Sequence, residues 1–157
     1  MSVRYHWPMT ISDDLRHGRH CIFMLHVHLV FVTKYRRCVF TRSAIDDLRE
    51  IFEKVCEDFE ANLVEIDGEE DHVHLLVNYP PKVAVSQLVN SLKGVSSRLL
   101  RQRQPDIAQR YWRGVLWSPS YFAAACGGAP LSIIRQYIEN QRTPGEAASR
   151  LGALTSA

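Results

Sequence analysis

The sequence lacks several features that mark familiar protein classes. Its four cysteines contain no closely spaced pair, which excludes a zinc ribbon and a CxxC redox site. No apolar run approaches the ~20 residues of a membrane-spanning helix. GxSxG, glycine-rich phosphate-loop and HExxH motifs are missing, and the clustered carboxylates offer no dispersed acidic triad for two-metal chemistry. These absences exclude a transmembrane protein and leave the common enzyme classes poorly supported.

Length and composition indicate one globular domain. The chain has 157 residues, of which 46% are hydrophobic and 23% are charged. That length suits a single domain with a true core, and that composition excludes wholesale disorder. No signal-peptide pattern precedes the cysteines, so we expect reduced thiols in a cytoplasmic protein.

The small net charge of +2 conceals a strong segregation of charge along the chain. Twelve of the seventeen carboxylates lie within residues 46–71, whereas residues 82–113 hold seven basic residues and one acidic residue. A second basic cluster comprises Lys34, Arg36, Arg37 and Arg42; Tyr35 and Phe40 accompany it, and Tyr111 and Trp112 accompany the first. A positive pole of this kind suits a polyanion, and a solvated helix face is the alternative interpretation.

Hydrophobic periodicity predicts the regular elements of the first half. Residues 21–33 are rich in β-branched and aromatic side chains and predict a long strand. Ser43, with Asp46 three residues on, predicts the N-cap of an amphipathic helix with an acidic outer face. Residues 62–67 and 71–78 predict a hairpin around an acidic turn.

The second half predicts a helix, a strand and a further helix. Apolar spacing over residues 85–100 indicates a helix, which Pro105 ends. Residues 115–126 predict a strand, although Pro119 favours an edge position or a late start. A last helix is expected within residues 130–143, with a proline in its first turn.

The resulting order, β-α-β-β-α-β-α, predicts an α+β protein. Its first six elements match a ferredoxin-like (split βαβ) fold, an antiparallel sheet with two helices on one face. The seventh element is an added C-terminal helix, and the other sheet face is left for a ligand or a second sheet. We expect a loosely structured arm at residues 1–20, one domain at 21–143 and a flexible tail at 144–157.

The strand at residues 71–78 carries the first candidate site. Because strand side chains alternate, Val73, Leu75 and Val77 are expected to face the core. His72 and His74 then lie side by side on the open face, where two imidazoles can ligate one metal ion. A pair of surface histidines without a ligand is the alternative interpretation.

A second pair, His26 and His28, has the same spacing on the first strand. Both pairs cannot be presumed to bind metal. His28 could line the same sheet face and help to hold a substrate, or both could be satisfied polar groups. We favour His72 and His74 because they lie beside an acidic turn at the start of a short strand, where a ligand can approach.

The last predicted helix carries the second candidate site. Tyr137 and Gln141 are four residues apart and are therefore neighbours on one helical face. Tyr137 lies on the shoulder of the helix's apolar stripe. A half-buried packing tyrosine with a wet hydroxyl is the alternative to a functional one.

Four separated segments, in this order, resemble one protein family: DHVHLLV, LKGVSSRLLR, LWSPSYFAAACGGAP and IIRQYIENQ. They are similar to the single-tyrosine transposases of the smallest bacterial insertion sequences, the TnpA type, and VFVTKYRR fits as well. The resemblance covers about residues 22–143. It leaves His26 without an assignment.

The resemblance implies a His-hydrophobic-His (HUH) nuclease that cleaves and rejoins single-stranded DNA at insertion-sequence ends through a 5′-phosphotyrosine. Carried over by residue, it makes Tyr137 the nucleophile and His72, His74 and Gln141 the ligands of Mg²⁺ or Mn²⁺. It also implies recognition of end hairpins, a bacterial or archaeal cytoplasm, and a homodimer in which each tyrosine helix docks against the partner subunit's histidine pair.

Two other functions stay open at this point. One is a domesticated or non-catalytic module of the same fold that binds hairpins without turnover. The other is a replication-initiation or conjugative nicking enzyme, although those chains are usually larger. For all three, basic residues would contact phosphates and aromatic residues would stack on unpaired bases. The candidate DNA-binding residues are Lys34, Tyr35, Arg36, Arg37, Lys93 and Arg98.

Overall fold

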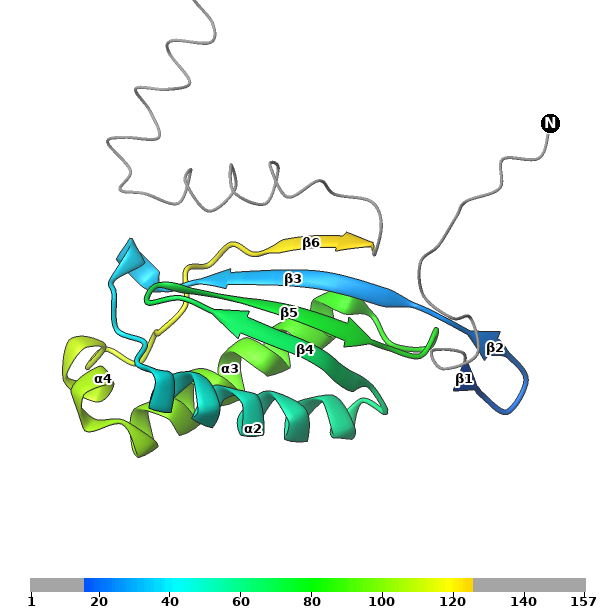
Figure 1. Ribbon diagram of the computed structural model, residues 1–157, viewed down its shortest axis with the longest axis horizontal. Helices are drawn as coiled ribbons and strands as arrows, with labels where there is room; N and C mark the ends of the chain where they lie inside the picture. The colour runs from blue at the N-terminus through cyan, green and yellow to red at the C-terminus, as the bar shows by residue number, and fades with distance from the viewer. Residues whose placement is uncertain (1–15, 126–157) are drawn as a thin grey trace, which may run out of the picture.

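The structure is a computed structural model that describes residues 16–125. Figure 1 shows a sheet with the two long helices, α2 and α3, against one of its faces. The strands are β1 (Arg16–His17), β2 (Ile22–Phe23), β3 (His26–Val32), β4 (Asn62–Gly68), β5 (His72–Asn78) and β6 (Phe122–Ala125). The helices are η1 (Lys34–Arg36), α2 (Arg42–Asp58), α3 (Val85–Arg103) and α4 (Pro105–Arg110). No helix within residues 16–125 is both long and apolar enough to span a membrane.

The main sheet confirms the predicted α+β, ferredoxin-like architecture. Its strand order is β4-β5-β3-β6, and every neighbouring pair is antiparallel. The chain therefore forms two interleaved units, β3-α2-β4 and β5-α3-β6, which is the split βαβ arrangement. The central pair runs in register from His26 opposite Asn78 to Val32 opposite His72.

The core lies between the sheet and the two long helices. Val73, Leu75 and Val77 are at most 1% exposed and belong to this core, as the alternation predicts. The ring of Phe31 lies 5.7 Å from that of Trp117, and the indole nitrogen of Trp117 donates to Ser96 Oγ at 2.9 Å. On the opposite sheet face, Val30 and Val32 form a small second cluster with Phe122.

Several boundaries differ from the predicted ones. The strand expected at residues 21–33 is divided, because β2 pairs with β1 in a separate two-stranded sheet and only β3 joins the main sheet. Of the strand expected at 115–126, Trp117 makes an isolated antiparallel bridge with Thr33, and the continuous strand β6 begins only at Phe122, consistent with the late start that Pro119 favours. Pro105 does end α3, and it also occupies the first turn of the short helix α4, where its missing N–H is not needed.

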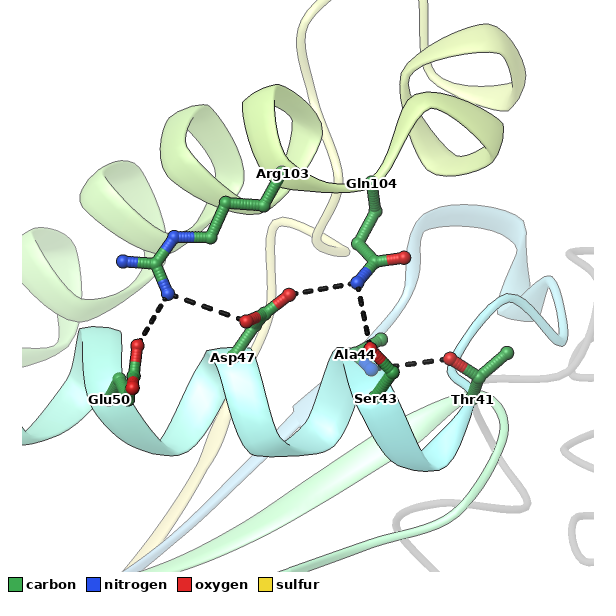
Figure 2. Close-up of polar contacts among 7 residues, drawn as sticks. All are labelled: Thr41, Ser43, Ala44, Asp47, Glu50, Arg103 and Gln104. Carbon is green, nitrogen blue, oxygen red and sulfur yellow. Dashed lines mark hydrogen bonds and ion pairs between the residues drawn. The ribbon is translucent and has the colours of Figure 1, made fainter.

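Polar contacts join the facing sides of α2 and α3 (Figure 2). Arg103 of α3 donates to Glu50 at 2.8 Å and lies 3.4 Å from Asp47. Gln104 donates to the other oxygen of Asp47 at 2.8 Å. Charges that are segregated in the sequence are thus partly paired in space.

The N-cap of α2 is Thr41, not Ser43, so the predicted cap was wrong by two residues. Thr41 has extended backbone angles (φ −91°, ψ 171°), and its hydroxyl accepts from the backbone N–H of Ala44 at 3.2 Å. Ser43 lies inside the first turn, where its hydroxyl accepts from Gln104 at 3.3 Å (Figure 2). Both residue types can cap, so the extended backbone at Thr41 decides between them.

We expect Thr41→Ala to lower the free energy of unfolding by about 1 kcal/mol, because it leaves an N-terminal N–H of α2 unsatisfied. Ser43→Ala, the matched control, is expected to cost less than about 0.5 kcal/mol because it removes an exposed contact. Urea denaturation followed by circular dichroism measures both. A larger loss for Ser43→Ala would contradict the assignment of the cap.

Candidate metal centre and nucleic-acid interface

His72 and His74 lie side by side at the start of β5, on the sheet face opposite the helices. Their ring centroids are 5.0 Å apart, and the rings are inclined by 76°. His72 is 6% exposed and His74 is half-buried. The cross-strand partners of the pair are Val32 and Val30, which places both imidazoles over the small apolar cluster of that face. The structure thus gives the geometry that the alternation of β5 predicts.

Asp71 fixes the orientation of His72. Its Oδ1 lies 2.7 Å from His72 Nδ1, and since a carboxylate only accepts, the ring nitrogen carries the proton and donates it. In this tautomer the lone pair of the ring is on Nε2, the nitrogen left for a cation. A carboxylate behind a histidine in this way is the usual support of a metal-binding imidazole.

The surroundings of His74 favour its neutral imidazole. Burial lowers the pKa of His74, and the neighbouring His72 acts in the same direction. Asp67, directly opposite His74 on β4, and Glu69 oppose this effect. A neutral imidazole has a lone pair to donate, so the lowered pKa suits a ligand.

The competing pair lies farther along the sheet. His26 pairs with Asn78 at the other end of β5, six residues from Val32 and hence roughly 20 Å from His72. Its Nε2 lies 3.3 Å from Asn78 Nδ2, and the Oδ1 of that amide accepts from Arg16 at 2.8 Å. These contacts give His26 a structural role.

His28 lies between the two ends of the sheet. It is opposite Leu76 and therefore diagonal to His74 on the same face. It is close enough to help to lower the pKa of His74. His28 therefore lines the face that carries the candidate site, as one of the sequence interpretations holds.

A complete metal site needs more than these two ligands. Within residues 16–125, no group of three histidine, cysteine, aspartate or glutamate side chains could hold a metal ion. Tyr137 and Gln141, the other two residues of the predicted site, lie outside the described residues. The donor chemistry of His72 and His74 fits a divalent cation, which would need at least one further ligand.

A pocket of about 380 Å³ combines basic and aromatic side chains. We call it the Trp112 pocket; it is lined by Lys34, Tyr35, Arg37, Arg110, Tyr111, Trp112, Arg113 and Val115. It joins the turn after β3 to the turn after α4, segments more than 70 residues apart in the chain. Cationic groups beside exposed ring faces are the elements of a surface that binds single-stranded nucleic acid.

Internal contacts hold the pocket's shape. Arg37 donates to the carbonyl of Arg110 at 2.7 Å, and its guanidinium carbon lies 5.5 Å from the ring centroids of both Tyr35 and Tyr111. The hydroxyl of Tyr111 donates to the carbonyl of Lys34 at 2.9 Å. Trp112 is 73% exposed, so its ring face is accessible to an incoming base.

The predicted DNA-binding residues separate into distinct environments. Lys34, Tyr35 and Arg37 line the Trp112 pocket, whereas Arg36 is ion-paired with Asp71 at 2.6 Å. Arg98 is exposed on α3.

Lys93 makes hydrogen bonds inside the protein. Its ammonium group donates to the carbonyls of Ser118, Pro119 and Ser120 at 2.6 to 3.3 Å, and burial lowers its pKa. These bonds hold the loop that leads into β6, and a role of Lys93 in DNA binding stays a prediction.

The candidate DNA-binding residues omitted five that line the pocket: Arg110, Tyr111, Trp112, Arg113 and Val115. The guanidinium of Arg113 lies 4.9 Å from the ring centroid of Trp112. The sequence signal was the aromatic pair Tyr111-Trp112 beside basic residues. Nothing in the local pattern indicates that this pair lies against Lys34.

Comparisons with known proteins agree on one family. The family model described as "Transposase IS200 like" matches residues 21–141. The ISDra2 transposase TnpA of Deinococcus radiodurans is 30% identical over 128 residues, covering 82% of this chain and 91% of its own length. The transposase for insertion sequence element IS200 of Salmonella typhimurium is 32% identical over 114 residues, covering 73% of this chain and 74% of its own length. A solved structure from Deinococcus radiodurans, of a protein assigned as a transposase, superposes with a TM-score of 0.75 at 34% identity and covers 82% of this chain and 98% of its own.

We expect His72→Ala and His74→Ala each to weaken Mn²⁺ binding by more than about tenfold, because each removes one imidazole from the candidate centre. His26→Ala, at the far end of the same sheet, should stay within about twofold of the unmodified protein. Titration of free Mn²⁺ by electron paramagnetic resonance measures all three. Loss of binding in His26→Ala alone would mean that the wrong pair is assigned.

Proposed function

Because the chain belongs to the IS200-like transposase family, we propose that it cleaves and rejoins single-stranded DNA at the ends of an insertion sequence. The observation that carries this proposal is the pair of adjacent imidazoles at His72 and His74, one of them held by Asp71. The family supports a transposase in general terms.

In the proposed reaction, the phenolic oxygen of Tyr137 attacks the scissile phosphorus. A phosphorus–oxygen bond to the tyrosine forms, the bond to the 3′ oxygen breaks, and the 3′-hydroxyl leaves with a proton. The product is a 5′-phosphotyrosine, and covalent catalysis of this type divides one difficult step into two easier ones. Since one phosphodiester replaces another, rejoining by a 3′-hydroxyl needs no external energy source.

His72, His74 and Gln141 would hold the divalent cation, Mg²⁺ or Mn²⁺, in this proposal. When bound, it stabilises the negative charge that develops on the phosphate oxygens. All three side chains are neutral ligands, which leaves the charge of the ion directed at the phosphate. Two imidazoles favour Mn²⁺ over Mg²⁺ because they are softer ligands than carboxylates.

We further propose that the protein acts as a homodimer. In this arrangement the helix carrying Tyr137 and Gln141 docks against the histidine pair of the partner subunit. Within residues 16–125, both long helices lie against the other face of the sheet (Figure 1), which is compatible with the docking of a further element beside His72 and His74.

The proposed DNA contacts centre on the Trp112 pocket. Lys34 and Arg37 would neutralise phosphates, while the exposed rings of Tyr35 and Trp112 would stack on unpaired bases. The pocket adjoins the turn that follows β3, and Val32, the last residue of β3, is opposite His72. A strand bound in the pocket therefore enters beside the candidate metal centre. Hairpins at the element's ends are the proposed substrate.

We expect Tyr137→Phe to abolish the covalent protein–DNA adduct while hairpin binding is retained, because only the nucleophilic oxygen is removed. The assay uses a labelled single strand that carries an end hairpin, with Mn²⁺, resolved on a denaturing gel. Mass spectrometry of the unmodified protein should locate a nucleotide fragment on Tyr137.

Two results would count against this mechanism. An adduct that persists in Tyr137→Phe would remove Tyr137 from the role of nucleophile. Tight hairpin binding by the unmodified protein, with no adduct under any metal condition, would instead favour the non-catalytic hairpin-binding module.

We expect Trp112→Ala to weaken binding of a labelled oligothymidylate by about 1–3 kcal/mol, the usual contribution of one base–aromatic stack. Trp112→Phe keeps a ring face and should lose less than about 1 kcal/mol. Fluorescence anisotropy at one fixed salt concentration measures both variants. Equal losses in the two variants would show that stacking is not the interaction at this position.

A further inference from the structure

The neighbouring residues Arg36 and Arg37 point to different places. Arg37 lines the Trp112 pocket and stacks between two tyrosines. Arg36 does not line that pocket, and its side chain is only 17% exposed. Its Nε donates to Asp71 Oδ2 at 2.6 Å.

The carboxylate of Asp71 is shared between Arg36 and His72. One oxygen accepts from the guanidinium at 2.6 Å, and the other accepts from His72 Nδ1 at 2.7 Å. The side chain of Asp71 is 12% exposed. Both carboxylate oxygens thus have a bonding partner, and rotation of the carboxylate would break both contacts. Arg36 and His72 are therefore linked through the carboxylate of Asp71.

The turn that places Arg36 is unusual. Tyr35 and Arg36 have φ angles of 64° and 51°, the left-handed region that non-glycine residues rarely adopt. Such strain persists only where surrounding contacts fix it, and it is concentrated at functional sites. Here the backbone N–H of Thr33 donates to the Asp71 carbonyl at 2.9 Å, and that of Lys34 donates to the Leu116 carbonyl at 2.8 Å.

The side chain of Arg36 carries a second unfavourable feature. Its Nη1 is buried and has no hydrogen-bond partner within the described residues. A buried donor without a partner destabilises the fold. Two unfavourable features at one residue indicate that Arg36 is kept for something other than stability.

We propose that Arg36 is a positioning residue of the metal centre, which holds Asp71 so that His72 presents Nε2 to the cation beside His74. It is then not a DNA contact, although it belongs to the same basic sequence cluster. This inference rests on the metal site of the proposed function.

Charge balance supports the same assignment. A lone carboxylate behind His72 would partly cancel the positive charge that a bound cation directs at the phosphate. The guanidinium of Arg36 offsets the charge of Asp71, so that the pair is neutral overall. The site keeps the orienting hydrogen bond without the opposing charge.

The test compares Arg36→Gln with Arg37→Gln, two identical changes at adjacent positions. Two affinities are measured for each: Mn²⁺ alone by electron paramagnetic resonance, and a labelled oligothymidylate without metal by anisotropy. Arg36→Gln should weaken Mn²⁺ binding by about 10- to 100-fold, the usual effect of losing support behind a metal ligand, and change DNA affinity less than about twofold. Arg37→Gln should show the reverse pattern. Arg36→Lys, which keeps the charge but offers a single contact point, should fall between the unmodified protein and Arg36→Gln.

The inference is overturned if Arg36→Gln binds Mn²⁺ as the unmodified protein does, or loses as much DNA affinity as Arg37→Gln. Should Arg36→Gln fail to fold, the same two measurements on Asp71→Asn decide, with weaker Mn²⁺ binding at unchanged DNA affinity expected. Unmodified protein that binds no Mn²⁺ would overturn the metal site itself, a failure distinct from that of Arg36.

Discussion

The pairing of β3 with β5 is the constraint on which the candidate site depends. Its register places Val32 opposite His72, so the two imidazoles lie on the face opposite the helices while Val73, Leu75 and Val77 enter the core. A slip of one residue would reverse every side chain of β5 and send both histidines under the helices. Burial of each aliphatic side chain contributes about 1.5–3 kcal/mol, and that burial is what prevents the slip. Hydrophobic packing on the helix-covered face of the sheet therefore determines where the histidine pair lies on the other face.

The same sheet end connects the two candidate surfaces. β3 ends at Val32, and the turn that follows holds Lys34 and Arg37 toward the Trp112 pocket and Arg36 toward Asp71. Arg36 and Arg37 face different ways because the backbone of this turn is left-handed at Tyr35 and Arg36. The alternation of a β-strand is not the cause. The proposed DNA contacts and the proposed support of the metal are thus divided between adjacent residues of one turn. In this proposal, a basic run that forms a single cluster in the sequence has two chemical roles.

Periodicity in the sequence was enough to predict the fold class and the placement of His72 and His74, because alternation is a local property of β5. It could not predict which cap begins α2, since Thr41 and Ser43 are both capping residues and the backbone angle decides. Periodicity also could not predict that Trp112 and Lys34 line the same pocket. That arrangement depends on how α4, more than 70 residues farther along the chain, packs against the turn after β3. The turn of Arg36 left no signal at all, because tyrosine and arginine do not favour the left-handed region that they adopt there. The last predicted helix, with Tyr137 and Gln141, lies outside the described residues, so that part stays a prediction.

Charges that are segregated along the chain can be paired in space, so the basic residues that stay unpaired in the described part of the chain locate the proposed polyanion surface more sharply than composition does. Arg103 is paired with acidic residues of α2, Lys82 contacts Glu60, and Arg36 is paired with Asp71. Among the salt bridges within residues 16–125, none involves the basic residues of the Trp112 pocket. Their neighbours are aromatic rings and backbone carbonyls, which hold a cation in place without cancelling its charge. A phosphate that approaches the Trp112 pocket therefore meets positive charge that no carboxylate of the described residues compensates. The turn after β3 connects this pocket to the strand end where Val32 lies opposite His72.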